Sequence, residues 1–114
     1  MKYLITAIAA VLLVGCGPSV DIHQAAYDGN IEAVKQHLAA GTDVNAKASR
    51  GWTPLHSVAT KEIAELLIAK GADVNARDFL GMTPLNMAAG HKKTADLLRK
   101  HGGKTGEELK AEGK

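Results

Sequence analysis

Three residues near the end of the chain, Gly103–Thr105, spell the last part of a phosphate-binding P-loop, Gly-Lys-Thr. In such a loop another glycine stands five residues earlier, and a β-strand leads into the loop. Here the earlier position is Leu98, and residues 94–101 have the pattern of a helix. The motif therefore loses its value as an argument for a nucleotide-using enzyme.

The same stretch is better explained as the end of a fold. Thr105 with Glu108 three residues later forms a capping box, which starts a helix. Leu109 can then fold back against the preceding helices, while Lys110 and Lys114 face water. We expect Gly103–Thr105 to belong to a polar end cap rather than to a phosphate site.

No other pattern in the chain predicts catalysis. The sequence has no serine elbow, no paired acid–base carboxylates and no dinucleotide-binding glycine pattern. None of the five histidines stands at metal-ligand spacing beside a cysteine or a carboxylate cluster. These are His23, His37, His56, His91 and His101. The sequence predicts a protein that is not an enzyme, with no metal, no cofactor and no small-molecule substrate.

The composition favours packed helices and a neutral surface. The chain has 114 residues, with 14 Lys plus Arg against 12 Asp plus Glu, so its overall charge implies no strong attraction to nucleic acid or to anionic lipid. Only four residues are aromatic, namely Tyr3, Tyr27, Trp52 and Phe79. A core built from Ala, Leu, Ile and Val suits one small helical domain better than a sheet.

The first residues have the features of an export signal. Lys2 precedes a run of uncharged, mostly apolar residues, 3–14, which is too short to span a bilayer as a helix. The run ends in Leu-Val-Gly-Cys, which resembles the lipobox of bacterial lipoproteins. That resemblance implies a signal peptide at 1–15, acylation of Cys16 and a linker at 16–20. Cys16 is the only cysteine, so it has no disulfide partner within the chain.

The lipoprotein interpretation also predicts a location. In similar proteins, an Asp directly after the cysteine favours the inner membrane, whereas here that residue is Gly17. We expect a lipid-anchored protein of the bacterial envelope that faces the periplasm, on the outer membrane. The alternative is an uncleaved hydrophobic tail in which Cys16 is incidental.

Three segments of the chain align with one another, at residues 21–50, 51–80 and 81–114. Gly-x-Thr-Pro-Leu occurs at 51–55 and 81–85, and Asp-Val-Asn-Ala at 43–46 and 73–76. A threonine N-cap followed by proline is a helix start, and a glycine after a leucine-rich stretch is a helix stop. The starts are Thr53 and Thr83, and the stops are Gly41, Gly71 and Gly102. Each unit thus reads as two short helices, and stacked units share one core.

The strings Thr-Pro-Leu-His at 53–56 and Gly-Ala-Asp-Val-Asn-Ala at 71–76 resemble the ankyrin repeat. The resemblance implies an all-α solenoid of about three helix-turn-helix units, joined by extended β-hairpin fingers at about 42–52 and 72–82. It also implies that His23 and His56 occupy one repeat position and bond to turn backbone. Two connections, at 58–62 and 90–93, are shorter than the family pattern, so Thr60 should cap a second helix.

Fingers and first helices supply the candidate binding residues. Large apolar or arginine side chains at finger positions have no neighbouring core to enter, and such types are frequent at interface centres. We predict partner contacts from Arg50, Trp52, Arg77, Phe79 and Met82, together with Gln24, Tyr27 and Ser57. The alternative is that the finger residues pack finger against finger.

The sequence therefore predicts a membrane-anchored ankyrin module that binds an unidentified protein partner through its fingers. A second hypothesis is an accessory or stabilising factor for one specific periplasmic enzyme. The two differ in whether the partner is single and obligate.

Overall fold

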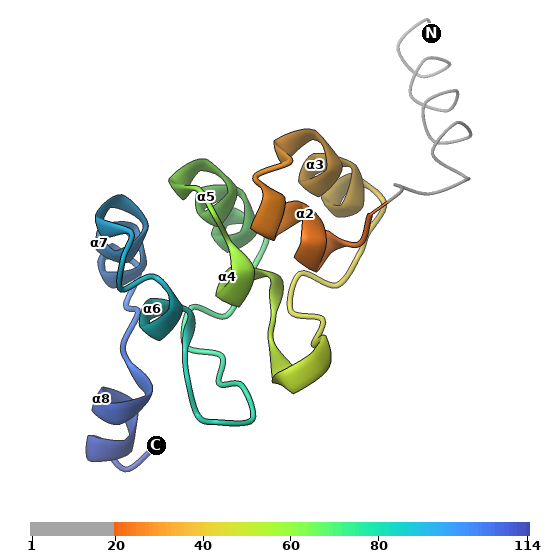
Figure 1. Ribbon diagram of the computed structural model, residues 1–114. Helices are drawn as coiled ribbons and strands as arrows, with labels where there is room; N and C mark the ends of the chain where they lie inside the picture. The colour runs from red at the N-terminus through yellow and green to blue at the C-terminus, as the bar shows by residue number, and fades with distance from the viewer. Residues whose placement is uncertain (1–19) are drawn as a thin grey trace, which may run out of the picture.

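The computed structural model describes residues 20–114, so the predicted signal peptide at 1–15, Cys16 and Gly17 lie outside the described residues. Two rows of helices run along the molecule (Figure 1). The elements are α2 (Ile22–Asp28), α3 (Ile31–Ala39), the 3-10 turn η2 (Ser49–Gly51), α4 (Pro54–Ser57), α5 (Lys61–Ala69), α6 (Pro84–Met87), α7 (Lys92–Lys100) and α8 (Gly106–Ala111). Within 20–114, no helix is long and apolar enough to cross a membrane.

The first helices of the units, α2, α4 and α6, form one row, and the second helices, α3, α5 and α7, form the other. The core lies between the rows and continues from unit to unit. Its largest side chains are almost wholly buried, and they include Val34, Leu55, Ile63, Leu67 and Leu98. This confirms the predicted all-α solenoid of stacked helix pairs.

The helix boundaries follow the predicted local signals. Thr53 and Thr83 are N-caps with proline at the first helical position, and the Thr60 side chain accepts from the amide of Ile63 at the start of α5. α4 has only four residues against seven in α2, because the connection between the helices of the second unit is shortened. The glycines that follow α3, α5 and α7 all have positive φ, as helix stops require: Gly41 83°, Gly71 96° and Gly102 86°.

The fingers correct one expectation. Residues 20–114 contain no β-strand, so the predicted β-hairpin form of the fingers is not supported. One backbone bond closes each finger, from Ala48 N–H to the Trp52 carbonyl (2.7 Å) and from Asp78 N–H to the Met82 carbonyl (2.9 Å). Elsewhere in the fingers, backbone amides donate to side chains, as at Asn45 and Asn75, or to turn carbonyls, as at Gly51 and Gly81.

One asparagine in each finger joins it to the next unit. The Asn45 side chain donates to the Gly71 carbonyl (3.2 Å) and accepts from Asp73 N–H (2.8 Å). Asn75 repeats this with Gly102 (3.1 Å) and Lys104 (2.8 Å). Each asparagine side chain thus bonds the backbone that directly follows the second helix of the next unit.

α8 forms as predicted, but it lies beside the second finger and not against the helix pairs: Leu109 lines a hollow with Ala76 and Arg77 and is not part of the shared core. Thr105 and Glu108 form the capping box, and Leu109 is buried. The Lys104 ammonium pairs with Glu112, and Gly106 approaches the Gly81 carbonyl so closely that a Cβ would stand 2.0 Å from it. The Gly-Lys-Thr stretch is therefore part of this end cap.

His56 connects α4 to the second finger. Its Nδ1 accepts from Thr53 N–H (3.0 Å), so Nε2 carries the proton and donates to the Met82 carbonyl (2.9 Å). His23 differs, although the sequence places it at the same repeat position. It is the second residue of α2, and its Nε2 donates to the Ala46 carbonyl (2.7 Å). Both histidines bond to backbone as expected, but they bond at different points of the fingers.

Gly51 and Gly81 provide a matched pair for testing finger packing. Both have positive φ, 77° and 80°, but a Cβ on Gly51 would meet the Phe79 ring at 2.7 Å, whereas one on Gly81 meets nothing within 4 Å. Alanine at either site should cost about 1–2 kcal/mol for the left-handed backbone. Gly51→Ala should lower the free energy of unfolding by roughly a further 1–3 kcal/mol, because its Cβ overpacks against the Phe79 ring. Urea unfolding of both variants measures the difference, and equal losses would show that Phe79 does not pack there.

The buried His56 should make stability depend on pH. Burial lowers the pKa of its imidazole below the ordinary 6.5, although the Met82 carbonyl and the Asp78 carboxylate oppose this. The unfolded chain then binds a proton at a higher pH than the folded chain does, so stability is present above about pH 6.5 and is lost as the pH falls toward the lowered folded pKa.

His56→Asn should reduce this pH dependence, because the amide does not titrate. The third unit shows that the cap tolerates asparagine, since Asn86 accepts from Thr83 N–H there at 2.9 Å. Unfolding free energies at pH 7 and pH 5 compare the two proteins. An unchanged difference between the two pH values would contradict the assignment to His56.

Candidate partner-binding surface

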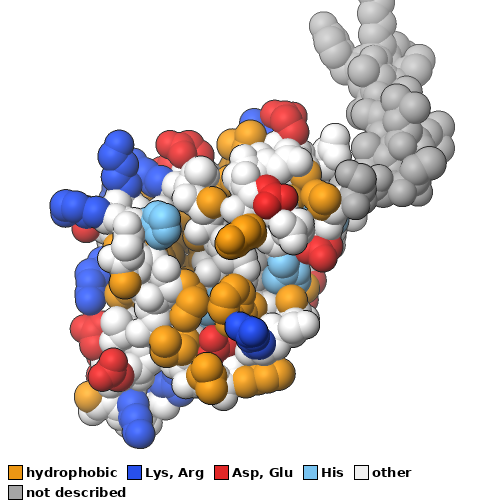
Figure 2. All heavy atoms as spheres, viewed as in Figure 1, with side chains coloured by type: hydrophobic (Ala, Val, Ile, Leu, Met, Phe, Trp, Pro, Cys, Tyr) orange, Lys and Arg blue, Asp and Glu red, His pale blue; other side chains and the backbone are white. Residues whose placement is uncertain are grey.

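The eight predicted contact residues come from the first helices of two units and from the two fingers. Gln24 and Tyr27 lie on α2 and Ser57 on α4, whereas the others lie on the two fingers. The finger residues are Arg50, Trp52, Arg77, Phe79 and Met82. Figure 2 shows apolar side chains gathered over the finger end of this face, beside basic ones.

Five of the eight residues line one hollow between the first helices and the first finger. They are Gln24, Tyr27, Arg50, Trp52 and Ser57. A neighbouring hollow shares Tyr27, Trp52 and Ser57 and extends toward Met87 and His91 of the third unit. The structure therefore brings together residues that lie up to 33 positions apart in the sequence.

The second finger contributes separately. Arg77 and Met82 line a third hollow, together with Leu80 and the α8 residue Lys110. The Arg77 guanidinium also donates to the Lys114 carbonyl (2.7 Å). Phe79 lines none of these hollows, and its ring lies against Gly51 instead. The eight residues thus form a connected group of five, a pair beside α8 and one finger contact.

Asp78 ties the two fingers together. One carboxylate oxygen accepts from the amides of Leu80 (2.8 Å) and Met82 (2.9 Å), and the other accepts from the Trp52 indole N–H (2.9 Å). The Trp52 ring also stacks on the His56 ring, with centroids 6.3 Å apart and 12° between the planes. The position of Trp52 is therefore set from two sides.

The environment of Asp78 keeps its carboxylate ionised. Burial raises the pKa of Asp78, but the hydrogen bonds from Met82, Leu80 and Trp52 outweigh it, so that the pKa lies below its ordinary value. An ionised acceptor makes stronger hydrogen bonds than a neutral one. Asp78 acts here as an internal anchor and not as a charge offered to a partner.

Finger-to-finger packing and exposure occur together in this surface. The Phe79 amide donates to the Arg50 carbonyl (2.8 Å), and Arg50 has a positive φ of 67° that directs this carbonyl. Yet Phe79 is 79 % exposed and Tyr27 is 66 % exposed. The two sequence alternatives, packing and an open contact surface, therefore apply to different atoms of the same fingers.

Two residues of this surface were not among the predicted contacts. Asp78 was missed because its partner Trp52 lies 26 positions away; the only signal is that the first finger has Ala48 at the matching position. Leu80 is 85 % exposed, more than any other large apolar side chain that the structure describes. Within residues 20–114, no group of three His, Cys, Asp or Glu side chains could hold a metal.

Comparison with known proteins identifies the family. The model for ankyrin repeats, in three copies, matches residues 22–108. Acyl-CoA-binding domain-containing protein 4 of Oryza sativa subsp. japonica is 53 % identical over 36 residues, which cover 32 % of this chain and 11 % of that protein. Protein phosphatase 1 regulatory subunit 27 of Homo sapiens is 38 % identical over 50 residues, which cover 41 % of this chain and 32 % of that protein.

These matches cover between about a tenth and a third of the relatives' own length, so they concern the repeat region. The family match covers most of the chain and coincides with the stacked helix pairs α2 to α7. The chain belongs to the ankyrin-repeat family.

Proposed function

We propose that this chain is a non-catalytic module that binds a protein partner through its fingers and first helices. The family supports an interaction role, because repeat arrays use their extended concave surfaces for binding. The observation that carries the proposal is the hollow lined by five of the eight residues chosen from sequence. Their side chains come from separate segments and meet at one place.

Each side chain of this hollow has a distinct part to play. Trp52 forms a fixed wall, because Asp78 and His56 hold its ring. Tyr27 is largely exposed and Arg50 is exposed at the rim. Aromatic and arginine side chains that are already positioned lose little freedom on binding, so they suit an interface centre. Gln24 and Ser57 supply polar contacts beside them.

A second candidate function is an accessory factor for one periplasmic enzyme. The observation that favours it is the human relative, which is named as a regulatory subunit of a phosphatase. In that case the hollow would hold one enzyme as its obligate partner. Cross-linking in intact cells distinguishes the two, since a general interaction module yields several partners.

The membrane anchor forms part of the same proposal. Residues 1–15 would be removed as a signal peptide, and the acylated Cys16 would hold the chain at the outer membrane, facing the periplasm. Support comes from the Leu-Val-Gly-Cys sequence and from the lack of any second cysteine. Residues 17–20 would reach roughly 14 Å at about 3.5 Å per residue, so the first unit would stay near the bilayer.

Affinity purification from envelope membranes tests the binding surface. Tyr27→Ala and Arg50→Asn should each weaken capture of the partner about tenfold or more. The reason is that truncating a residue at the centre of an interface costs about 2 kcal/mol or more of binding free energy. Asparagine is chosen at position 50 because it tolerates the left-handed backbone. Glu62→Ala, on the exposed outer side of α5, is the control and should retain capture. Equal capture by all three variants would refute the surface.

Cys16→Ser tests the anchor. Without the thiol no acyl chain can attach, so the protein should leave the membrane fraction or accumulate as an unprocessed precursor. Fractionation and intact mass of the purified protein measure both outcomes. If the variant is processed and fractionates as the original does, the lipoprotein proposal fails, whereas the binding surface stands.

A further inference from the structure

The tip of the second finger presents two apolar side chains to solvent. Gly81 N–H donates to the Asp78 carbonyl (2.9 Å), which closes a turn with Phe79 and Leu80 at its two central positions. Their side chains are 79 % and 85 % exposed. Figure 1 shows the loop between α5 and α6 projecting away from the helix rows. A projecting tip of this kind is convex, unlike the hollows beside it.

The repeat itself does not require apolar residues at these positions. The matching positions of the first finger are Ser49 and Arg50, and that finger is closed by the same type of backbone bond. Phe79 has a contact with Gly51 to explain it, whereas Leu80 is almost fully in solvent. Packing within the protein therefore does not explain why Leu80 is apolar, and contact with something outside the protein would.

The backbone N–H groups of this tip all have hydrogen-bond partners within the protein. The four successive amides from Phe79 to Met82 all donate within the protein. Phe79 donates to the Arg50 carbonyl (2.8 Å) and Gly81 to the Asp78 carbonyl (2.9 Å), while Leu80 and Met82 donate to the Asp78 carboxylate (2.8 and 2.9 Å). Moving one unpaired backbone N–H group from water into an apolar medium costs roughly several kcal/mol. Here that penalty is already avoided for these four N–H groups.

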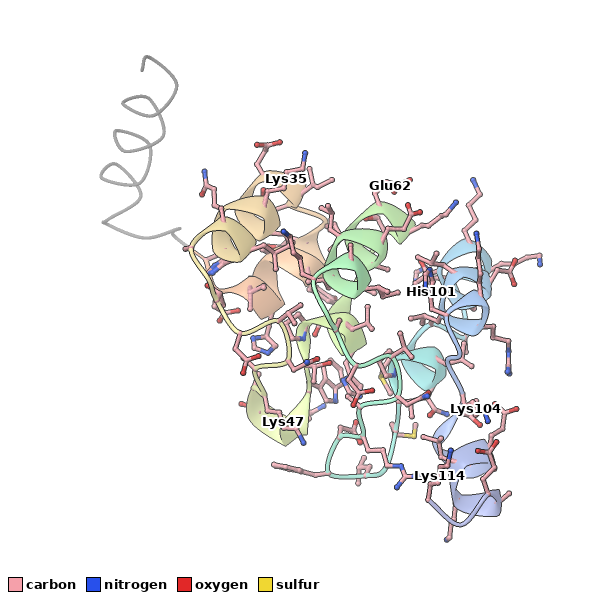
Figure 3. The ribbon with its side chains drawn as sticks, turned by 180° about the vertical axis from the view of Figure 1, so that it is seen from behind. Lys35, Lys47, Glu62, His101, Lys104 and Lys114 are labelled. Carbon is pink, nitrogen blue, oxygen red and sulfur yellow. The ribbon has the colours of Figure 1, made fainter. Side chains whose placement is uncertain are left out.

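Cationic side chains surround the tip. Arg50 adjoins Phe79, and the hollows on either side of the second finger are lined by Lys47, Arg77, Lys110 and Lys114. Figure 3 shows Lys47 and Lys114 at the finger end of the molecule, whereas Lys35 and Glu62 project from the opposite end. The carboxylates beside these five cations are Asp73 and Glu107, which line the same hollows, and Glu112, which lies 3.6 Å from the Lys114 ammonium. Asp78 is buried, so the rim of the tip is mainly positive.

We propose that this fingertip docks on an anionic bilayer, with Phe79 and Leu80 inserted at the headgroup boundary. Insertion of an apolar group with cations beside it is the combination that holds peripheral proteins on anionic lipid. A convex tip with a positive rim fits a lipid surface, and the protein partner keeps the hollow lined by Tyr27 and Trp52. This docking does not depend on the proposed partner or on Cys16.

A fluorescent label at position 80 tests the docking directly in the full chain. Leu80→Cys is made together with Cys16→Ser, and the thiol is labelled with a dye that brightens in apolar surroundings. Glu62→Cys, with the same second change, carries the control label at the opposite end. The probes are phosphatidylcholine vesicles with and without phosphatidylglycerol. Because no protein partner is present, failure here leaves the partner proposal untouched.

The label at position 80 should brighten severalfold with vesicles that contain phosphatidylglycerol, and the response should fall at high salt because charge attraction is screened. The control label should stay dim, even if the apolar N-terminal stretch binds the vesicles. A silent label at position 80, or equal responses at positions 80 and 62, would overturn the proposal. In either case the exposed tip would be assigned to a protein interface instead.

Discussion

No unit of this chain can bury its own apolar face, so every unit depends on its neighbour. The helix pairs are short, with four to nine residues per helix, and isolated helices of that length are marginal in water. Their stability comes from the continuous core that runs through Val34, Ile63 and Leu98. α8 lies beside the second finger, where Leu109 is buried outside this core.

The stacked units also hold the fingers in place. The fingers contain no strand ladder, and turn carbonyls and side chains bond the finger backbone instead. Asn45 and Asn75 bond the backbone of the following unit, and Asp78 joins the second finger to Trp52 of the first. The two asparagine bonds are exposed and the Asp78–Trp52 bond is partly buried, so the order of the fingers depends on these bonds together. The geometry of the finger surface is therefore set by neighbouring units together and by no single unit.

Local signals in the sequence predicted the local structure well. The caps at Thr53, Thr60 and Thr105 act within three residues, so the sequence alone reveals them. The predicted β-hairpin form is not supported, because each finger is closed by one backbone bond and is otherwise held by turn bonds and by side chains. The pairing of Asp78 with Trp52 across 26 positions also could not be read from spacing. The structure brings five of the eight predicted residues to one hollow, whereas the bond that holds Trp52 in place was not predicted.

The central claim is that Asp78 holds the fingers as one rigid edge, and amide hydrogen exchange tests it most directly. The amides of Leu80 and Met82, which donate to this carboxylate, should exchange slowly in the native protein. In Asp78→Ala they should exchange much faster, while amides within α7 keep their protection. If Leu80 and Met82 already exchange like an open loop in the unaltered protein, the fingers are not held in this way and the account is contradicted.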